Sequence, residues 1–147
     1  GSGCVMIGGI GANGVSSPVY NTAGVANGIV ALGSTSVANA YIQVDWTVVS
    51  DSRDKIVSGN VPLGLDFVSK LSPKAFHFTE TRGDETPYGP LRYGFLAQEV
   101  MALEGPNPVI VDDDDADHLK MTNTELIPVL VNAIKELKIE VDKLRAA

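Results

Sequence analysis

Hydrophobic and polar residues follow two different patterns along the chain. Up to residue 40 the apolar bursts are short, as at residues 5–7 and 28–32, and glycine or asparagine interrupts them every few positions. Such interruption disfavours long helices and favours tight turns between short strands. Apolar and polar residues then alternate over residues 41–48, which predicts a half-buried strand. The apolar positions of this strand are Ile42, Val44, Trp46 and Val48.

A compact mixture of helices and strands is predicted after residue 50. Leu63, Phe67, Val68 and Leu71 share one helical face, while residues 74–82 alternate as a strand does. The predicted elements are a helix over 63–71 ended by Pro73, a strand over 74–82, turns at Gly83-Asp84 and Gly89-Pro90, a returning strand over 92–96, a helix over 97–103 and a strand over 108–111.

A helix over about residues 123–146 is the clearest element. Thr122 and Glu125 have the spacing of a capping box. The apolar residues that follow have the 4-3-4-3 spacing of a coiled coil: Leu130, Ile134, Leu137, Val141 and Leu144. So narrow a stripe leaves an isolated helix marginally stable. The helix therefore packs against copies of itself or folds back on its own domain, and the pattern leaves both open. Ile and Val at a and Leu at d would favour two strands.

The charge distribution divides the chain near residue 50. The 147 residues carry a net charge of −7, yet residues 1–49 contain one charged side chain, Asp45, and the other 28 follow. An uncharged sheet on its own would expose unprotected strand edges. Residues 1–49 are therefore predicted to end a β-rich fibre whose edges pair between chains, and residues 50–147 to form a small mixed domain. A flexible Gly/Ser-rich linker is the alternative for residues 1–49, against which the alternation at 41–48 argues. The fold class is α+β.

Composition excludes several classes of function. The single Cys4 excludes a disulfide framework and a cysteine zinc site. No apolar run of about 18 residues could span a membrane, and the acidic balance argues against nucleic-acid binding. Residues 9–14 match the dinucleotide fingerprint, but Pro18 follows where a helix should begin and no acidic residue stands about 20 positions on. No cofactor is expected.

Three further motifs have simpler explanations. The acidic stretch Asp112 to Asp115 with Asp117 could bind calcium, but it lacks the glycine turn and closing glutamate of an EF-hand, so a solvated loop is favoured. His77 and His118 have no ligand partner at motif spacing, and no metal site is expected. Arg82-Gly83-Asp84 spells a cell-adhesion tripeptide where a hairpin turn is already predicted.

The strongest chemical signal lies at the junction, in Ser50-Asp51-Ser52-Arg53-Asp54-Lys55. A serine hydroxyl is a weak nucleophile until a base takes its proton, and a lysine acts as that base only where desolvation or nearby positive charge favours its neutral form. Ser50 and Lys55, with Arg53 as possible support, supply these groups. Five residues apart, the two share neither a strand face nor a helix face, so the chain must turn or a second chain must contribute. From residue types alone, a polar turn is the simpler reading.

These residues resemble the Ser-Asp-x-Arg-x-Lys opening of the intramolecular chaperone auto-processing domain of endosialidase-type bacteriophage tail spikes and tail fibres. The similarity covers about residues 50–147. Its other matching segments are 65–76, Tyr93-Gly94-Phe95-Leu96-Ala97-Gln98-Glu99-Val100, Glu125-Leu126-Ile127-Pro128 and Ala133-Ile134-Lys135-Glu136-Leu137.

The resemblance implies a homotrimer that guides the upstream fibre of its own chain into its fold and then cuts itself off. Ser50 would be the catalytic serine and Lys55 its base. The cut is expected at Ser50–Asp51, with Val49–Ser50 as second choice. Asp54 departs from relatives that have an apolar residue there, and its carboxylate would favour the charged lysine and slow the reaction.

The position of the cut bears on the mechanism. Attack of Ser50 on the preceding carbonyl of Val49 passes through a five-membered ring, whereas attack on its own carbonyl needs a strained four-membered one. Cleavage after Ser50 therefore points to a serine of another chain or to activated water.

The expected location is the virion tail fibre, made in the host cytoplasm, with the chaperone part released after cleavage. A non-cleaving trimerisation and receptor-binding tip is the alternative function. An enzyme acting on outside substrates fits less well, since no pocket-forming acid/base or oxyanion set is visible. On oligomeric state the family trimer is preferred to the a/d rule, because about two and a half heptads cannot decide it.

Overall fold

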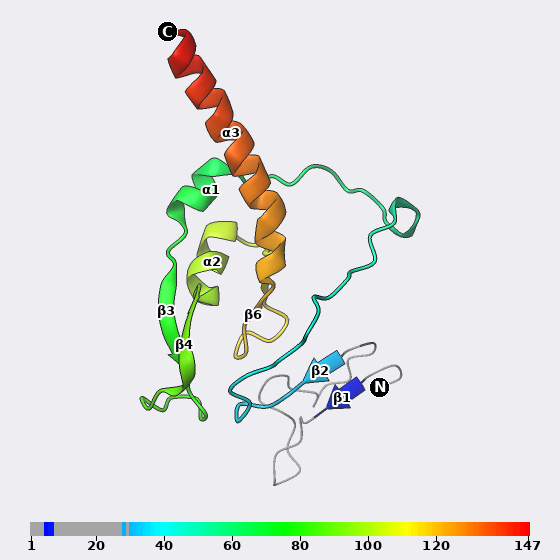
Figure 1. Ribbon diagram of the computed structural model, residues 1–147, viewed down its shortest axis with the longest axis vertical. Helices are drawn as coiled ribbons and strands as arrows, with labels where there is room; N and C mark the ends of the chain where they lie inside the picture. The colour runs from blue at the N-terminus through cyan, green and yellow to red at the C-terminus, as the bar shows by residue number, and fades with distance from the viewer. Residues whose placement is uncertain (1–4, 8–27, 29) are drawn as a thin grey trace. The chain divides into compact units, whose positions relative to one another are not determined.

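The computed structural model describes residues 5–7, 28 and 30–147, and these fall into two compact units that are described separately. The first unit contains residues up to 45 together with 75–92, and the second contains 46–74 and 93–147. The fold is mixed α+β with small two-stranded sheets and a long C-terminal helix (Figure 1). The glycine motif at residues 9–14 lies outside the described residues.

The first unit contains short strands. β1 (Val5–Ile7) pairs in parallel with β2 (Val30–Leu32), and β3 (Lys74–Phe78) pairs with β4 (Tyr88–Gly94). The Arg92 guanidinium donates to the Ala38 carbonyl at 2.6 Å, so two stretches of chain far apart in the sequence are joined within this unit. The turn predicted at Gly83 forms there with a φ of +83°, a backbone conformation that glycine adopts without strain.

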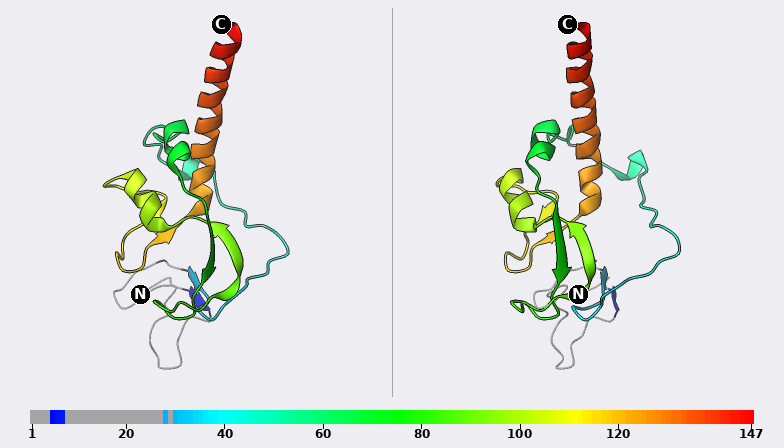
Figure 2. Two further views of the ribbon diagram at one scale, coloured as in Figure 1. Left: turned by 90° about the vertical axis from the view of Figure 1, so that its left-hand side faces the viewer. Right: turned by 60° about the vertical axis from the view of Figure 1, so that its left-hand side comes forward.

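The second unit contains the helices. α1 (Leu65–Lys70) and α2 (Ala97–Glu104) lie where helices were predicted, and a two-residue β5 (Val111–Asp112) pairs antiparallel with β6 (Lys120–Met121). The 3-10 turns η1 (Ser52–Asp54) and η2 (Asn123–Glu125) precede α1 and α3 (Leu126–Ala146). α1 lies beside the middle of α3 in every view (Figure 2).

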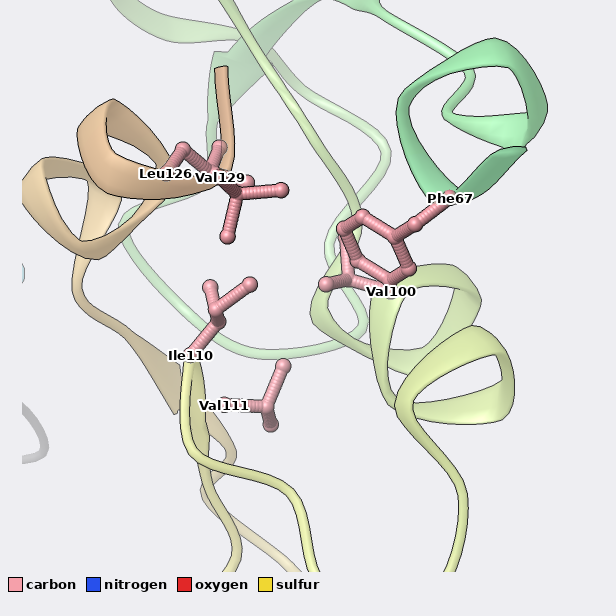
Figure 3. Close-up of a cluster of buried hydrophobic side chains, with 6 residues drawn as sticks. All are labelled: Phe67, Val100, Ile110, Val111, Leu126 and Val129. Atoms are coloured by element: carbon pink, nitrogen blue, oxygen red, sulfur yellow. The ribbon is translucent and has the colours of Figure 1, made fainter. Parts of the chain in front are cut away.

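One small core holds this second unit together. Its six buried side chains come from α1, α2, α3 and the segment around β5, and they converge on one another (Figure 3). Val100, Val111 and Val129 are almost completely excluded from solvent. The buried residues are Phe67, Val100, Ile110, Val111, Leu126 and Val129.

α3 uses two different faces, and this bears on both readings of its pattern. Leu126, Val129 and Ala133 are buried against the unit itself. The predicted coiled-coil positions remain open, from 36% exposed at Val141 to 77% at Leu144. The helix is therefore folded back on its own domain and still presents a free apolar stripe.

The strand predicted at 41–48 is wrong for the single chain. None of the two-stranded sheets among the described residues includes it, and the apolar side chains of this stretch are exposed, Trp46 by 70%. Alternation reports which positions could be buried, but a strand forms only where a neighbouring backbone supplies the ladder hydrogen bonds.

Two local signals were also misread. Gly89 and Pro90 lie inside β4 rather than in a turn, which a two-stranded sheet tolerates because proline can take an edge position. The capping box at Thr122 and Glu125 does not form, because the Thr122 amide donates to the Ile110 carbonyl at 2.9 Å and Thr122 makes no side-chain cap. Among the described residues, the buried Oε2 of Glu125 has no hydrogen-bond partner.

Candidate functional site

The proposed catalytic residues lie on a short turn at the junction. Asp51 caps η1, and its Oδ1 accepts the Arg53 amide at 2.9 Å. The Lys55 amide then donates to the Ser52 carbonyl at 3.3 Å, which closes the turn. Ser50 and Lys55, which are five positions apart and share no regular face, are thereby brought to one side of the turn.

The turn places the lysine amine on the serine hydroxyl. Lys55 Nζ donates to Ser50 Oγ over 2.6 Å, a distance within which a proton can be exchanged between the two groups. Once the ammonium loses a proton, the bond can reverse and the amine can accept the serine proton. A hydroxyl and an amine in contact are the kinds of groups that Ser–Lys acyl transfer uses as nucleophile and base.

Asp51 and Arg53 form a two-pronged ion pair beside this contact. Arg53 Nε donates to Asp51 Oδ1 at 3.0 Å and Nη2 donates to Oδ2 at 2.7 Å. The side-chain hydrogen bond from Arg53 lowers the pKa of Asp51, and the same bond raises the pKa of Arg53. Both therefore stay charged, and the pair holds the conformation of the turn between Ser50 and Lys55.

The site is open to solvent in the single chain. All residues from 46 to 60 are exposed, including the apolar Val49 at 76% and Ile56 at 96%. Cavities of the second unit lie elsewhere, among them one of about 350 Å³ beside Phe95 and Val100, one of about 270 Å³ beside Leu63 and Val129 and one of about 450 Å³ beside Leu65 and Glu136. The turn thus holds a serine hydroxyl and a lysine amine in contact, and the described side chains do not enclose them.

The segment after the turn is fixed to α3 by two side chains that belong to no recognised sequence motif. Asn132 Nδ2 donates to the carbonyls of Val61 and Leu63, each at 3.0 Å, and Glu136 Oε2 accepts the Leu65 amide at 2.8 Å. Their spacing of four on one helical face was a possible signal. The partners, about 70 residues away, leave no mark in the sequence.

The other candidate motifs do not form a site. The acidic stretch makes local turns, in which Asp112 accepts the Asp114 amide and Asp115 accepts the Asp117 amide. A hydrogen bond from His118 lowers the pKa of Asp115. Among the described residues no group of three or more His, Cys, Asp or Glu is arranged to hold a metal ion.

No helix among the described residues has both the length and the apolar character needed to cross a membrane.

His77 Nδ1 lies 3.1 Å from the Gly89 carbonyl, a contact between β3 and β4. Arg82 to Asp84 lies in the turn between β3 and β4, where the Asp84 amide bonds the Thr81 carbonyl.

Comparison with known proteins identifies the segment that carries this turn. A family model described as chaperone of endosialidase, Peptidase_S74, matches residues 50–110 and so begins at the serine that Lys55 contacts. No curated protein and no solved structure matches the chain. Residues 50–110 of this chain are therefore similar to the Peptidase_S74 family, described as chaperone of endosialidase.

Proposed function

We propose that this chain is the C-terminal intramolecular chaperone of a bacteriophage tail fibre or tail spike. It promotes trimerisation and folding of the β-rich segment upstream, and then releases itself by Ser50–Lys55 autoproteolysis. One observation carries the proposal: the 2.6 Å contact between Lys55 Nζ and Ser50 Oγ, at the first residue of the matched family segment. Residues 51–147 would be the released part, and residues up to 50 would stay with the fibre.

In the reaction Lys55 takes the hydroxyl proton and the serine oxygen attacks a backbone carbonyl. For cleavage at Ser50–Asp51, the hydroxyl of a neighbouring chain's serine forms an ester with the Ser50 carbonyl carbon. The Asp51 nitrogen leaves with a proton, and water hydrolyses the ester. Direct attack by activated water gives the same products in one step. For cleavage at Val49–Ser50, the same chain's hydroxyl attacks through a five-membered ring and water hydrolyses the resulting ester.

The exposure of the site supports a requirement for assembly. A lysine amine becomes a base when it is desolvated, and residues 46–60, which include the turn, are all exposed in the described part of the single chain. Neighbouring chains of a homotrimer would supply that cover. They would also pair the alternating residues 41–48 and bury the free stripe of α3, each of which is exposed in one chain. Cleavage would then follow assembly, within the virion tail fibre made in the host cytoplasm.

A denaturing gel of freshly expressed protein tests the proposal. Wild type should give two fragments, residues 1–50 and 51–147, whereas Ser50→Ala and Lys55→Ala should persist at full length. Ser52→Ala is the matched control, because this serine lies on the same exposed turn and engages Lys55 only through its backbone carbonyl. Mass spectrometry of the new N-terminus distinguishes Asp51 from Ser50.

The opposite results are equally informative. Cleavage that continues unchanged in both Ser50→Ala and Lys55→Ala would contradict the dyad. Wild-type protein that stays intact as a stable trimer would contradict self-cleavage and favour a trimerisation and receptor-binding tip.

A further inference from the structure

Asn132 and Glu136 together form what we call the α3 clamp, which holds the chain entering α1. Asn132 donates both of its amide protons to the carbonyls of Val61 and Leu63, and Glu136 accepts the first amide of α1 at Leu65. The two side chains stand one helical turn apart, so both face the same stretch of chain. The segment 61–65 is thereby bound to α3 by side-chain to backbone bonds, and Leu63 also packs against the core.

Gly64 makes this contact possible. Its φ of −156° lies outside the left-handed region, but its ψ of −134° lies outside the extended region that residues with a side chain favour. A Cβ at this position would also overlap the Glu136 carboxylate, with Cδ only 2.8 Å away. α1 has no side-chain cap from its own N-cap residue. Glu136 therefore supplies the acceptor and the negative charge that the start of a helix favours, and Gly64 leaves the space for it.

The clamp is also the first attachment of the catalytic turn to the folded unit. Residues 56–60 are exposed and make no hydrogen bond in the described structure. Six residue steps separate Lys55 from Val61, which allow a reach of at most about 20–22 Å. Without the clamp, the next anchored side chain is Leu63, which packs against the core and lies eight steps from Lys55. Release of the clamp thus lengthens the tether that carries Ser50 and Lys55 by about a third.

We propose that Asn132 and Glu136 are positioning residues for self-cleavage, because they hold the Ser50–Lys55 turn at a short, fixed distance from α3. This inference rests on the proposed function, since it concerns the same turn meeting a neighbouring chain. The effective concentration of a tethered group falls roughly as the −3/2 power of tether length, so a tether longer by about a third slows cleavage about 1.5-fold. Loss of the fixed direction of approach slows it further.

The experiment compares cleavage rates of the full-length chain at equal trimer concentration. Three single variants each disrupt one part of the clamp: Glu136→Ala, Asn132→Ala and Gly64→Ala. Glu136→Gln keeps one carbonyl acceptor and should restore much of the rate. Glu140→Ala is the matched control, because Glu140 lies one turn further along α3 and pairs with Lys143. Amide hydrogen exchange at Leu65 reports directly whether the clamp is open.

The clamp variants should cleave at least about 1.5-fold more slowly than wild type and Glu140→Ala, with faster exchange at Leu65 and unchanged trimer mass. The double variant Gly64→Ala with Glu136→Ala should be no slower than the slower single variant, because both remove the same contact. A purely structural role would instead lower the rate in proportion to lost trimer, and no rescue by Gln would follow.

Two results would overturn the inference, and they differ. Normal cleavage in variants whose Leu65 amide exchanges faster contradicts the positioning role alone. Wild-type protein that never cleaves, and is indistinguishable from Ser50→Ala, contradicts the proposed function and the positioning role together.

Discussion

Glu104, the last residue of α2, holds the loop that follows it by accepting three successive backbone amides. Its Oε1 accepts from Val109 at 2.9 Å and from Ile110 at 2.8 Å, and its Oε2 accepts from Val111 at 3.0 Å. Ile110 and Val111 are core residues, only 2% and 1% exposed, so water cannot replace the carboxylate at their amides. Glutamate at this position therefore connects α2 to the core strand β5.

The substitution Glu104→Gln isolates one of these bonds. In its better orientation glutamine keeps a carbonyl oxygen toward Val109 and Ile110 but presents an NH₂ group to the amide of Val111. A buried N–H left without an acceptor costs about 1–3 kcal/mol. Glu104→Ala leaves the Ile110 amide unpaired as well, and its expected cost is about 2–5 kcal/mol.

Urea unfolding followed by far-UV circular dichroism measures both, because α1, α2 and α3 all lie in the second unit. The measurement uses a Ser50→Ala background and one protein concentration, so that cleavage and mass action do not shift the midpoint. With a slope of about 2 kcal/mol per molar urea, a loss of 2 kcal/mol moves the midpoint by about 1 M.

Glu99→Gln is the control for this measurement. It makes the same chemical change on the same helix, but at a carboxylate that is 43% exposed and 3.3 Å from Lys74. A pair of this kind contributes about 0–1 kcal/mol. A Glu104→Gln variant no less stable than Glu99→Gln would refute the assignment of the three amides to this carboxylate.

Three further predictions concern the core, the free stripe and the catalytic turn. Phe67→Ala should lower the free energy of unfolding by about 3–5 kcal/mol in the same urea assay, since Phe67 is 6% exposed at the centre of the core; a loss under 1 kcal/mol would contradict its burial. Ile134→Lys, at a position 67% exposed, should leave the circular dichroism of the chain unchanged but reduce its mass in light scattering, whereas an unchanged trimer would exclude this stripe from assembly. Because Arg53 lowers the pKa of Asp51, the stabilisation from this pair is present above the unfolded-state pKa and is lost as pH falls through the lower folded pKa. The Arg53 Nε chemical shift should therefore stay constant from pH 7 to about 5 and move toward that of a free guanidinium only below about 4, and a change complete by pH 6 would count against the pair.

Local signals predicted the elements that local contacts build. The apolar spacing around Phe67 and the residues around Val100 predicted α1 and α2, and the spacing of Ser50 and Lys55 called for a turn or a second chain, of which the single chain shows the turn. Each of these depends on residues within a few positions of one another. A pattern of side chains is sufficient evidence where the partners are neighbours in sequence.

Patterns whose partners lie far away in the sequence gave a wrong prediction or none. The alternation at 41–48 predicted a strand that the single chain has no sheet to receive. The capping box failed because the Ile110 carbonyl, twelve residues earlier, takes the Thr122 amide. Asn132 and Glu136 looked like ordinary surface residues of a helix, since nothing in their pattern reveals the backbone groups near Leu65.

The two faces of α3 connect assembly with cleavage. One face buries Val129 and Ala133 and carries the clamp, while the stripe through Ile134 and Leu137 remains free for other chains. The coiled-coil and folded-back readings of this helix therefore describe different faces and do not compete. If three chains join along the stripe, each clamp sets its own Ser50–Lys55 turn at the same height along the common axis. In such an assembly the three turns would be brought toward one another, and the helix that assembles the chains would also determine when they can be cut.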